Sequence, residues 1–300
     1  MPIEPNGYEP ETGENRMSSD SLSGSGALYP VATPIGNLGD ISHRAAQTLA
    51  GADFIAAEDT RVTRKLLSHL GLKKPLVSYY EHNRRDSGEK ILSRILSGED
   101  CALVTDAGTP GISDPGEELI RMCIDAGVPV IAIPGPCAAV TALVLSGLPA
   151  GRFAFEGFLS TARKSRVEHL NELKTEKRTM VFYEAPHKLV RTLDDMLASF
   201  GDRRVAISRE ITKIYEETLR CSLSGAAAHY KTNPPRGEFV IVVEGVQKIE
   251  EPGPSLEDAV EAAQAQIALG DSIKDAVRKV SAESGIPKNS LYKAVISKTN

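Results

Sequence analysis

Three loops of this sequence, each after an expected strand, combine glycine, proline and hydroxyl residues. They read TPIGNLGDI at 33–41, DAGTPGISDPG at 106–116 and PGPCAAVTA at 134–142. Glycine allows a positive φ and a close approach of the backbone to a ligand, and proline fixes the turn. Since ligands of α/β sheets bind beyond the carboxyl ends of the strands, the loops predict a preformed pocket lined by main-chain groups. Such a pocket suits a neutral or zwitterionic nucleoside-like ligand.

The loops lack the fingerprints of common nucleotide sites. No GK[ST] follows, as a Walker A motif requires, and no GxGxxG opens a helix with an acidic residue about 20 positions on. ATP and NAD are therefore disfavoured. The six histidines show no ligand spacing with carboxylates or thiols, so no metal site is expected. The alternative that the loops are only tight turns is weakened by their number.

Charged side chains also follow expected strands. In AAEDTRVTRKLL at 56–67, Asp59 or Thr60 is a candidate helix N-cap. Arg61 and Arg64 could instead present guanidinium groups to phosphates.

Two further strand ends carry mixed groups. SYYEHNRRD at 78–86 combines aromatic, basic and hydrogen-bonding side chains, as a nucleic-acid contact loop does, although a solvated loop has the same character. VFYEAPHKL at 181–189 places Glu184 and Lys188 at the start of a helix. These positions could face a crevice between two halves of the chain.

The elements around the loops define the fold class, which is α/β. From Ala27 to Gly147 short apolar runs alternate with helical periodicity, which favours a mainly parallel sheet covered on both faces. After a hinge near 148–151, fewer helices separate the last strands, so a mixed sheet is expected. The segment from 255 to 300 has only helical periodicity, and Ile273–Ile296 resembles a helix-turn-helix.

These patterns predict five regions. They are a disordered N-terminal tail at 1–26, an N-terminal α/β cofactor-binding domain at 27–148, a mixed α/β domain at 149–247, a linker at 248–254 and a helical module at 255–300. The last 30 residues contain six Lys or Arg and three Asp or Glu, so the tail is locally basic. It either contacts RNA or is a small packing appendage.

Composition limits the class of protein. With 35 Lys and Arg against 40 Asp and Glu, the net charge is −5, so any affinity for RNA must come from local patches. The four cysteines form no CxxC pair and lie mostly in apolar runs, which is typical of reduced core cysteines in an intracellular protein. Residues 1–26 lack the apolar core of a signal peptide, and no apolar run is long enough to span a membrane. We expect a soluble, cytoplasmic protein without a membrane partner.

Taken in order, TPIGNLGDI, AEDTR, DAGTPGISDPG, IPGPCAAVTAL, VFYEAPHKL, SREITK and GEFVIVVEG resemble the ribosomal RNA small subunit methyltransferase I family. The resemblance covers residues 27–246. It implies the tetrapyrrole methylase fold, also called the class III methyltransferase fold, with two α/β domains and a cofactor cleft between them. It further implies S-adenosyl-L-methionine as cofactor, a homodimer, and a substrate that is small-subunit (16S) ribosomal RNA or the assembled small subunit. The implied activity is 2′-O-ribose methylation of a cytidine.

The resemblance also implies which residues bind the cofactor. The first domain would supply Pro34, Gly36, Asp106, Ala107, Gly108, Ile112, Ser113, Asp114, Pro134, Gly135, Ala138, Ala139, Thr141 and Ala142. The second would supply Phe182, Tyr183, Gly237, Glu238 and Phe239. Cys137 departs from the small hydroxyl residue of many relatives.

A ribose hydroxyl is a weak acid, so its methylation favours a general base or a nearby cation. The candidate bases are Glu58, Asp59, Asp106, Glu184 and Glu210, and the candidate orienting groups are Arg61, His187, Lys188 and Arg209. We hypothesise that Glu184, with Lys188 one turn on, lies near the reacting hydroxyl, with Glu58 and Arg61 as the further catalytic candidates.

Three alternatives stay open. The same fold could serve a tetrapyrrole C-methyltransferase, although AEDTR and the basic tail then have no evident use. A non-catalytic RNA-binding assembly factor would bind the cofactor without turnover or not bind it. A generic nucleotide-binding α/β protein is the least specific reading.

Overall fold

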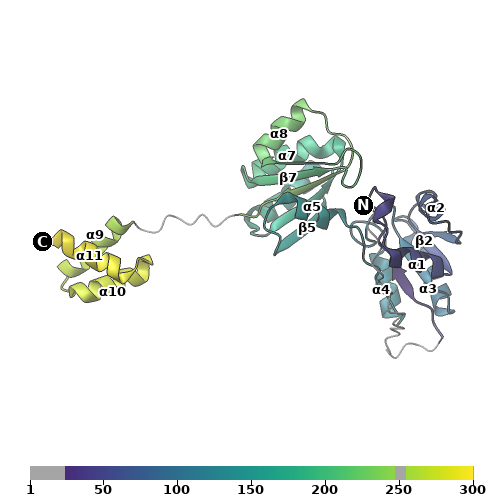
Figure 1. Ribbon diagram of the computed structural model, residues 1–300, viewed down its shortest axis with the longest axis horizontal. Helices are drawn as coiled ribbons and strands as arrows, with labels where there is room; N and C mark the ends of the chain where they lie inside the picture. Colours follow the sequence, from purple (N-terminus) through teal and green to yellow (C-terminus); the bar gives the residue numbers. More distant parts are fainter. Residues whose placement is uncertain (1–23, 247–254, 300) are drawn as a thin grey trace, which may run out of the picture. The chain divides into compact units, whose positions relative to one another are not determined.

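The computed structural model describes residues 24–246 and 255–299 (Figure 1). The chain divides into two compact units, Met1–Val246 and Gln247–Asn300. Most of the expected disordered tail at 1–26 and the whole expected linker at 248–254 lie outside the described residues.

The first α/β half is built on a four-stranded parallel sheet. Its strands β1 (Leu28–Pro30), β2 (Phe54–Ala57), β3 (Leu76–Ser78) and β4 (Cys101–Val104) lie in the order β1-β4-β2-β3. The helices of this half are η1 (Leu38–Asp40), α1 (His43–Gly51), α2 (Thr60–His69), α3 (Arg84–Leu96) and α4 (Glu117–Asp125). Strands β2 and β4 are fully buried because helices pack on both faces of the sheet. This confirms the expected parallel sheet.

One expected strand of this half is much reduced. The run VPVIAIPG forms only isolated bridges, Leu28 with Val130 and Val31 with Ile133. Prolines at 129 and 134 bracket the run, and a proline has no N–H for a ladder. The segment therefore lies along β1 without becoming a regular strand.

The second α/β half is built on a five-stranded mixed sheet, as expected. Its strands β5 (Phe153–Phe158), β6 (Thr179–Glu184), β7 (Arg204–Arg209), β8 (Glu217–Ser222) and β9 (Phe239–Val243) lie in the order β5-β6-β9-β7-β8. Only β5 and β6 pair in parallel. Helices α6 (Arg163–Glu172), η2 (Leu173–Thr175), α7 (Pro186–Phe200) and α8 (Leu223–Thr232) complete this half.

Helix α5 (Ala138–Ser146) lies before the expected domain division at 148/149 but packs against the second sheet. Its residues Ala139, Ala142 and Leu143 pack with Val181 and Val240 of the second sheet. The helix therefore belongs to the second half by its packing, and the chain crosses between the halves just before it. Sequence order suggested the first half because α5 is apolar on all sides, so its periodicity does not indicate which sheet it covers.

The C-terminal unit is a three-helix module of α9 (Leu256–Ala268), α10 (Ile273–Ser284) and α11 (Lys288–Thr299). Val260, Val277 and Leu291 lie in its shared core. Helix α10 ends at Gly285, whose φ of 73° closes the helix in the left-handed region, and Pro287 precedes α11. The segment Ile273–Ile296, expected to resemble a helix-turn-helix, corresponds to α10, this turn and most of α11. None of the helices within 24–246 and 255–299 has both the length and the apolar character needed to cross a membrane.

Candidate active site

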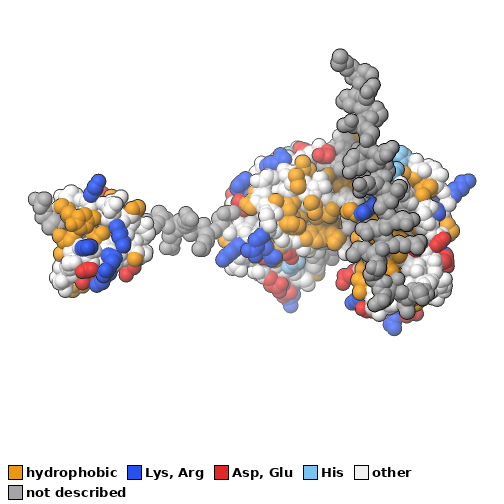
Figure 2. All heavy atoms as spheres, turned by 60° about the horizontal axis from the view of Figure 1, so that its bottom comes forward, with side chains coloured by type: hydrophobic (Ala, Val, Ile, Leu, Met, Phe, Trp, Pro, Cys, Tyr) orange, Lys and Arg blue, Asp and Glu red, His pale blue; other side chains and the backbone are white. Residues whose placement is uncertain are grey.

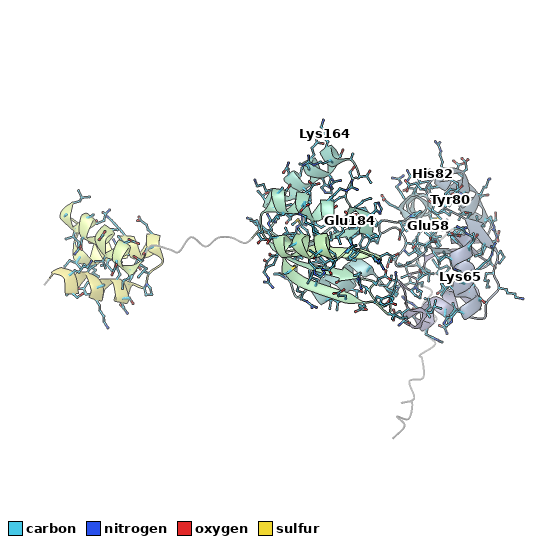
Figure 3. All side chains as sticks on the ribbon, turned by 90° about the horizontal axis from the view of Figure 1, so that it is seen from above. Glu58, Lys65, Tyr80, His82, Lys164 and Glu184 are labelled. Carbon is cyan, nitrogen blue, oxygen red and sulfur yellow. The ribbon has the colours of Figure 1, made fainter. Side chains whose placement is uncertain are left out.

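A cavity of about 290 Å³ lies where the loops of the first α/β half face the sheet of the second; we call it the central cavity. The first half contributes Ile35, Ala107, Gly108, Thr109, Ile112 and Asp114 to its lining. The other lining residues come from α5, its preceding loop and the second half: Cys137, Ala138, Phe158, Tyr183, Glu184, Ala185, Pro186, Ile211, Glu238, Phe239 and Val240. In Figure 3, Glu58 and Glu184 lie on the facing sides of the two halves.

The loops of the first half are tied together at this cavity. Thr33 and Gly108 exchange two main-chain hydrogen bonds, at 2.9 and 3.1 Å. Gly108 has a φ of 82°, which an L side chain rarely adopts. The hydroxyl of Thr109 donates to the carbonyl oxygen of Pro136 at 3.2 Å, so the loop after β4 also holds the loop before α5. The backbone on this side is thus preformed.

An aromatic wall closes the other side. The ring of Tyr183 packs against Phe155 and Phe158, with centroids 5.1 and 5.4 Å apart. Its hydroxyl accepts a hydrogen bond from the main-chain N–H of Ala139 at 3.2 Å, in the first turn of α5. Burial raises the pKa of Tyr183 to about 12, so the hydroxyl stays neutral. The ring planes meet at 72° and 59°, so the wall offers apolar ring faces and edges against which a planar ring can pack.

Acidic side chains gather at the carboxyl ends of β2 and β4. The main-chain N–H of Asp59 donates to Asp106 Oδ1 at 3.0 Å, and that of Asp106 donates to Glu58 Oε2 at 3.3 Å. Asp59 itself caps α2 and pairs with Arg61 at 2.6 Å, which holds its pKa at about 2. Asp59 is therefore the N-cap that the sequence suggested.

Asp114 is the member of this acidic group that faces the central cavity. Burial raises its pKa to about 6, and the negative charges of Glu58 and Asp106 act in the same direction. Its carboxylate has no hydrogen-bond or ion-pair partner among the described residues. Burial, together with the charge of Asp106, also raises the pKa of Glu58. A carboxylate with a raised pKa in a cleft is suited to accept a proton near neutral pH.

Glu184 also lines the central cavity, but its oxygens are already bonded. Its side chain is 3% exposed, Thr192 donates to it at 2.5 Å, and the N–H of Ala185 donates at 2.8 Å. Both donors belong to α7 or its N-cap, so the carboxylate fixes the start of that helix. Lys188 is half-buried on the same helix and does not line the cavity.

The predicted cofactor residues fall into three groups. Lining the central cavity are Ala107, Gly108, Ile112, Asp114, Ala138, Tyr183, Glu238 and Phe239. A neighbouring cavity of about 350 Å³ is lined by Pro34, Gly36 and Asp106, together with Ala107 and Glu238. Lining neither are Ser113, Pro134, Gly135, Ala139, Thr141, Ala142, Phe182 and Gly237.

Local geometry accounts for three of these eight residues. Phe182 alternates with Tyr183 along β6, so it points into the opposite core, and Ala142 faces the second sheet. Gly237 instead leaves room for Glu210, because a Cβ there would come within 2.6 Å of that side chain. Glu210 is paired with Lys213 at 2.9 Å, which also disfavours it as a base.

Eight residues that line the central cavity are not among the predicted cofactor or catalytic residues. They are Ile35, Thr109, Cys137, Phe158, Ala185, Pro186, Ile211 and Val240. Phe158 and Val240 carry a usable signal, since each lies near a strand end in a short apolar run. Ile211 stands within SREITK, between two residues of positive φ, Glu210 and Thr212, and nothing in that motif indicates that its side chain reaches the cavity.

Comparison with known proteins indicates the family of this chain. Residues 27–227 match the family Tetrapyrrole (Corrin/Porphyrin) Methylases. The Ribosomal RNA small subunit methyltransferase I of Halalkalibacterium halodurans is 46% identical over 282 residues, covering 93% of this chain and 98% of the relative. The protein of the same name from Synechocystis is 45% identical and covers 89% and 96%.

A solved structure shares the fold. Uroporphyrin-III C-methyl transferase from Thermus thermophilus, complexed with S-adenyl homocysteine, has a TM-score of 0.52 at 19% identity, covering 72% of this chain and 97% of that one. The expected fold and the resemblance drawn from the motifs are both confirmed. The chain belongs to the ribosomal RNA small subunit methyltransferase I family, within the tetrapyrrole methylases.

Proposed function

We propose that this protein transfers a methyl group from S-adenosyl-L-methionine to the ribose 2′-hydroxyl of a cytidine in small-subunit ribosomal RNA. The observation that carries the proposal is the central cavity, where a preformed backbone, an aromatic wall and an unpartnered carboxylate meet. The names of the relatives support the RNA substrate. The S-adenyl homocysteine held by the Thermus enzyme supports the cofactor.

The lining of the cavity fits this cofactor. Tyr183 and Phe158, with aliphatic neighbours, would hold the adenine ring, and the main chain of Ala107–Thr109 would bind polar groups. Asp114 and Glu238 place negative charge where a cationic ligand is favoured. When bound, the cofactor supplies a methyl group on a positively charged sulfur and leaves as the neutral thioether.

Asp114 accepts the proton of the ribose hydroxyl in this proposal. The carboxylate faces the cavity with its oxygens free, and its raised pKa makes it a stronger base than an ordinary aspartate while leaving it ionised above pH 6. Glu58 adds negative charge beside it, which favours the proton transfer. Glu184 with Lys188, the pair that the sequence favours, is the competing assignment. Arg61, whose side chain is largely exposed, is a candidate contact for RNA phosphate.

The exposed surface of α11 is our candidate for a second RNA contact. Lys288, Lys293 and Lys298 are exposed, the helix contains no acidic residue, and none of the three has an ion-pair partner within 255–299. Such lysines bind phosphate without reading sequence. Replacing Lys288 and Lys293 by Gln should weaken RNA binding about tenfold and flatten its salt dependence, whereas Lys279→Gln, whose amine pairs with Asp271, should change little. Equal effects of the two changes would dismiss α11 as the contact.

We also propose a homodimer formed through α5. Val140 and Val144 on its outer face are 49% and 73% exposed, and Phe153 of β5 is exposed nearby in the chain. Figure 2 shows hydrophobic side chains gathered on one face of the second half. A patch of this kind on an apolar helix is typical of a self-complementary interface. Val144→Glu should convert the dimer to a monomer in light scattering; a wild-type monomer would refute the interface.

The function is tested by supplying cofactor with a labelled methyl group together with small ribosomal subunits, large subunits or a uroporphyrinogen. We expect label only in the small subunit, and mass spectrometry of nuclease digests should locate it on the ribose of one cytidine. Label in the uroporphyrinogen would support a tetrapyrrole methylase instead. Cofactor binding in calorimetry with no labelled product would support the assembly-factor alternative. The cytoplasm, where small subunits are assembled, is the proposed location.

A further inference from the structure

A second cavity, of about 470 Å³, opens beside Asp114 on the first α/β half; we call it the acidic cavity. It is lined by Tyr79, Glu81, Arg84, Gly111, Ser113, Asp114, Pro115, Gly116, Glu117, Glu118 and Arg121. Asp114 lines this cavity and the central cavity alike. A ligand that filled the acidic cavity would therefore end at the carboxylate that faces the proposed cofactor site.

The charges of the acidic cavity disfavour an anion. Four of its lining residues are Asp or Glu, and two are Arg. Arg84 is already paired, with its Nε 3.0 Å from Glu118 and an Nη 3.6 Å from Glu81. The excess carboxylates favour a neutral or cationic group with N–H donors.

Tyr79 provides an independent sign of a ligand. Its side chain is 1% exposed and lines the acidic cavity. The main chain of Leu119 lies near its hydroxyl, but the hydroxyl has no hydrogen-bond partner of ordinary length and angle among the described residues. Leaving a buried hydroxyl unpaired is costly, so such a group is expected to be satisfied by something that enters the cavity. The hydroxyl can donate to a ring nitrogen or a carbonyl oxygen.

The floor of the cavity is rigid before any ligand binds. Gly116 has a φ of 151°, and a Cβ on it would come within 2.9 Å of the Gly111 nitrogen. Ser113 adopts a φ of 67°, which is uncommon for a residue with a side chain. The loop from 111 to 116 is thus folded tightly under the cavity, which keeps Asp114 in place.

We propose that the acidic cavity holds the base of the acceptor nucleotide, turned out of the RNA, and selects a base with an exocyclic amine. The inference rests on the proposed function, under which this base is cytosine. Glu81 and Glu118 would accept from the amine, as Asp and Glu do from cytosine N4, and Tyr79 would donate to an acceptor on the ring. Uracil places a carbonyl where the amine would be, so the carboxylates reject it. The ribose then lies at Asp114, between the two cavities.

The test uses small subunits reconstituted with ribosomal RNA carrying cytidine or uridine at the methylated position. Single-turnover rates over RNA concentration give the ratio of kcat/KM for the two bases. For the wild type we expect cytidine to be favoured about 10- to 100-fold. Glu81→Gln and Glu118→Gln should reduce this ratio at least fivefold, because an amide can also donate to a carbonyl. Tyr79→Phe should lower kcat/KM for cytidine about tenfold with an unchanged Kd for the cofactor.

Glu89→Gln is the matched control, since Glu89 is an exposed acid of α3 that pairs with Arg85 outside the cavity. A variant that only disturbs the fold would lower both rates and leave the ratio unchanged. Glu81 is 71% exposed, so its variant should fold even if the others do not. A wild-type ratio near one, or an unchanged ratio in the Glu81 and Glu118 variants, overturns the inference while cytidine methylation still stands. If the wild type methylates neither RNA, the proposed function fails and the inference with it.

Discussion

The two α/β halves each present a carboxylate to the central cavity, and they hold it in opposite ways. Glu184 of the second half is buried and bonded to Thr192 and Ala185. Asp114 of the first half faces the cavity without a partner among the described residues and has a pKa raised to about 6. The difference shows that an acid at a site is not by itself a candidate base. A carboxylate whose oxygens are already hydrogen-bonded stabilises the fold, whereas one whose oxygens are free can accept a proton.

The halves also differ in how the backbone behaves at the cavity. The first half supplies tight turns with residues of positive φ, including Gly108 and Ser113. The second supplies regular strands and an aromatic wall centred on Tyr183. A preformed turn holds a charged group in place, so the group does not have to be ordered in every catalytic cycle. We therefore assign proton transfer to the first half and enclosure of the cofactor mainly to the second.

The largest expected effect is that of Asp114→Asn. Asparagine keeps the size of the side chain but cannot accept the proton, so the single-turnover rate of methylation should fall about 10²- to 10⁴-fold. The Kd for the cofactor should also rise, because the variant loses one of the two negative charges that favour a cationic ligand, so the rates are compared at saturating cofactor. Rapid-quench assays with labelled cofactor measure the rate, and calorimetry measures the Kd. A rate near that of the wild type would show that Asp114 of the first half is not the base.

Glu184→Gln should have its main effect on stability. Replacing the carboxylate weakens the hydrogen bonds that fix α7, and we expect the free energy of unfolding to fall by about 1–3 kcal/mol with the rate within about threefold. Urea unfolding measures the free energy of unfolding, and rapid-quench assays measure the rate. Thr192→Val is the matched change on the donor side and should cost a similar amount. A large loss of rate at unchanged stability would instead restore Glu184 as the base.

The smallest expected effect is on the pH dependence of stability. The pKa of Asp114 is about 6 in the folded protein, against an ordinary value of 3.8. Protonation of this carboxyl therefore contributes fully to the free energy of unfolding below pH 4, and the contribution is lost as the pH rises through 6. Asp114→Asn should therefore raise the free energy of unfolding at pH 7.5 by about 1 kcal/mol, a value reduced for partial exposure, and leave it unchanged near pH 4. Urea unfolding at the two pH values measures this difference.

Asp59→Asn provides the opposite case. Its pKa is lowered to about 2 by Arg61, so its contribution is present above pH 4 and disappears as the pH falls toward 2. This variant should lose stability at pH 7.5. If both variants shifted stability in the same direction, the electrostatic contrast between Asp59 and Asp114 would be wrong.

The sequence predicted the parts of the fold that local chemistry determines. Glycine and proline mark the loops after β1 and β4, and apolar residues at three- and four-residue spacing mark the helices of the C-terminal module. The same loops led to Ala107, Gly108 and Asp114, which line the central cavity. These residues are recognisable because a turn of that kind needs particular residue types.

The rest depends on packing that one chain segment does not encode. Helix α5 gave no sign of which sheet it covers, since it is apolar on all sides. The choice of Glu184 as base required knowing that Thr192, eight residues on, reaches it. The acidic cavity exists only because α3 and α4 bring Arg84 and Glu118 together around the buried Tyr79. Neither the periodicity of apolar residues nor a sequence motif predicts tertiary contacts of this kind.

The most direct test of the central claim is the pH dependence of the single-turnover methylation rate, with saturating cofactor, for the wild type and Asp114→Asn. If Asp114 accepts the proton, the wild-type rate should fall about tenfold for each pH unit below 6 and level off above it. The variant should be slow and insensitive to pH between 5 and 8. An Asp114→Asn enzyme that kept the wild-type rate and the same fall below pH 6 would contradict the assignment of the base to the first half.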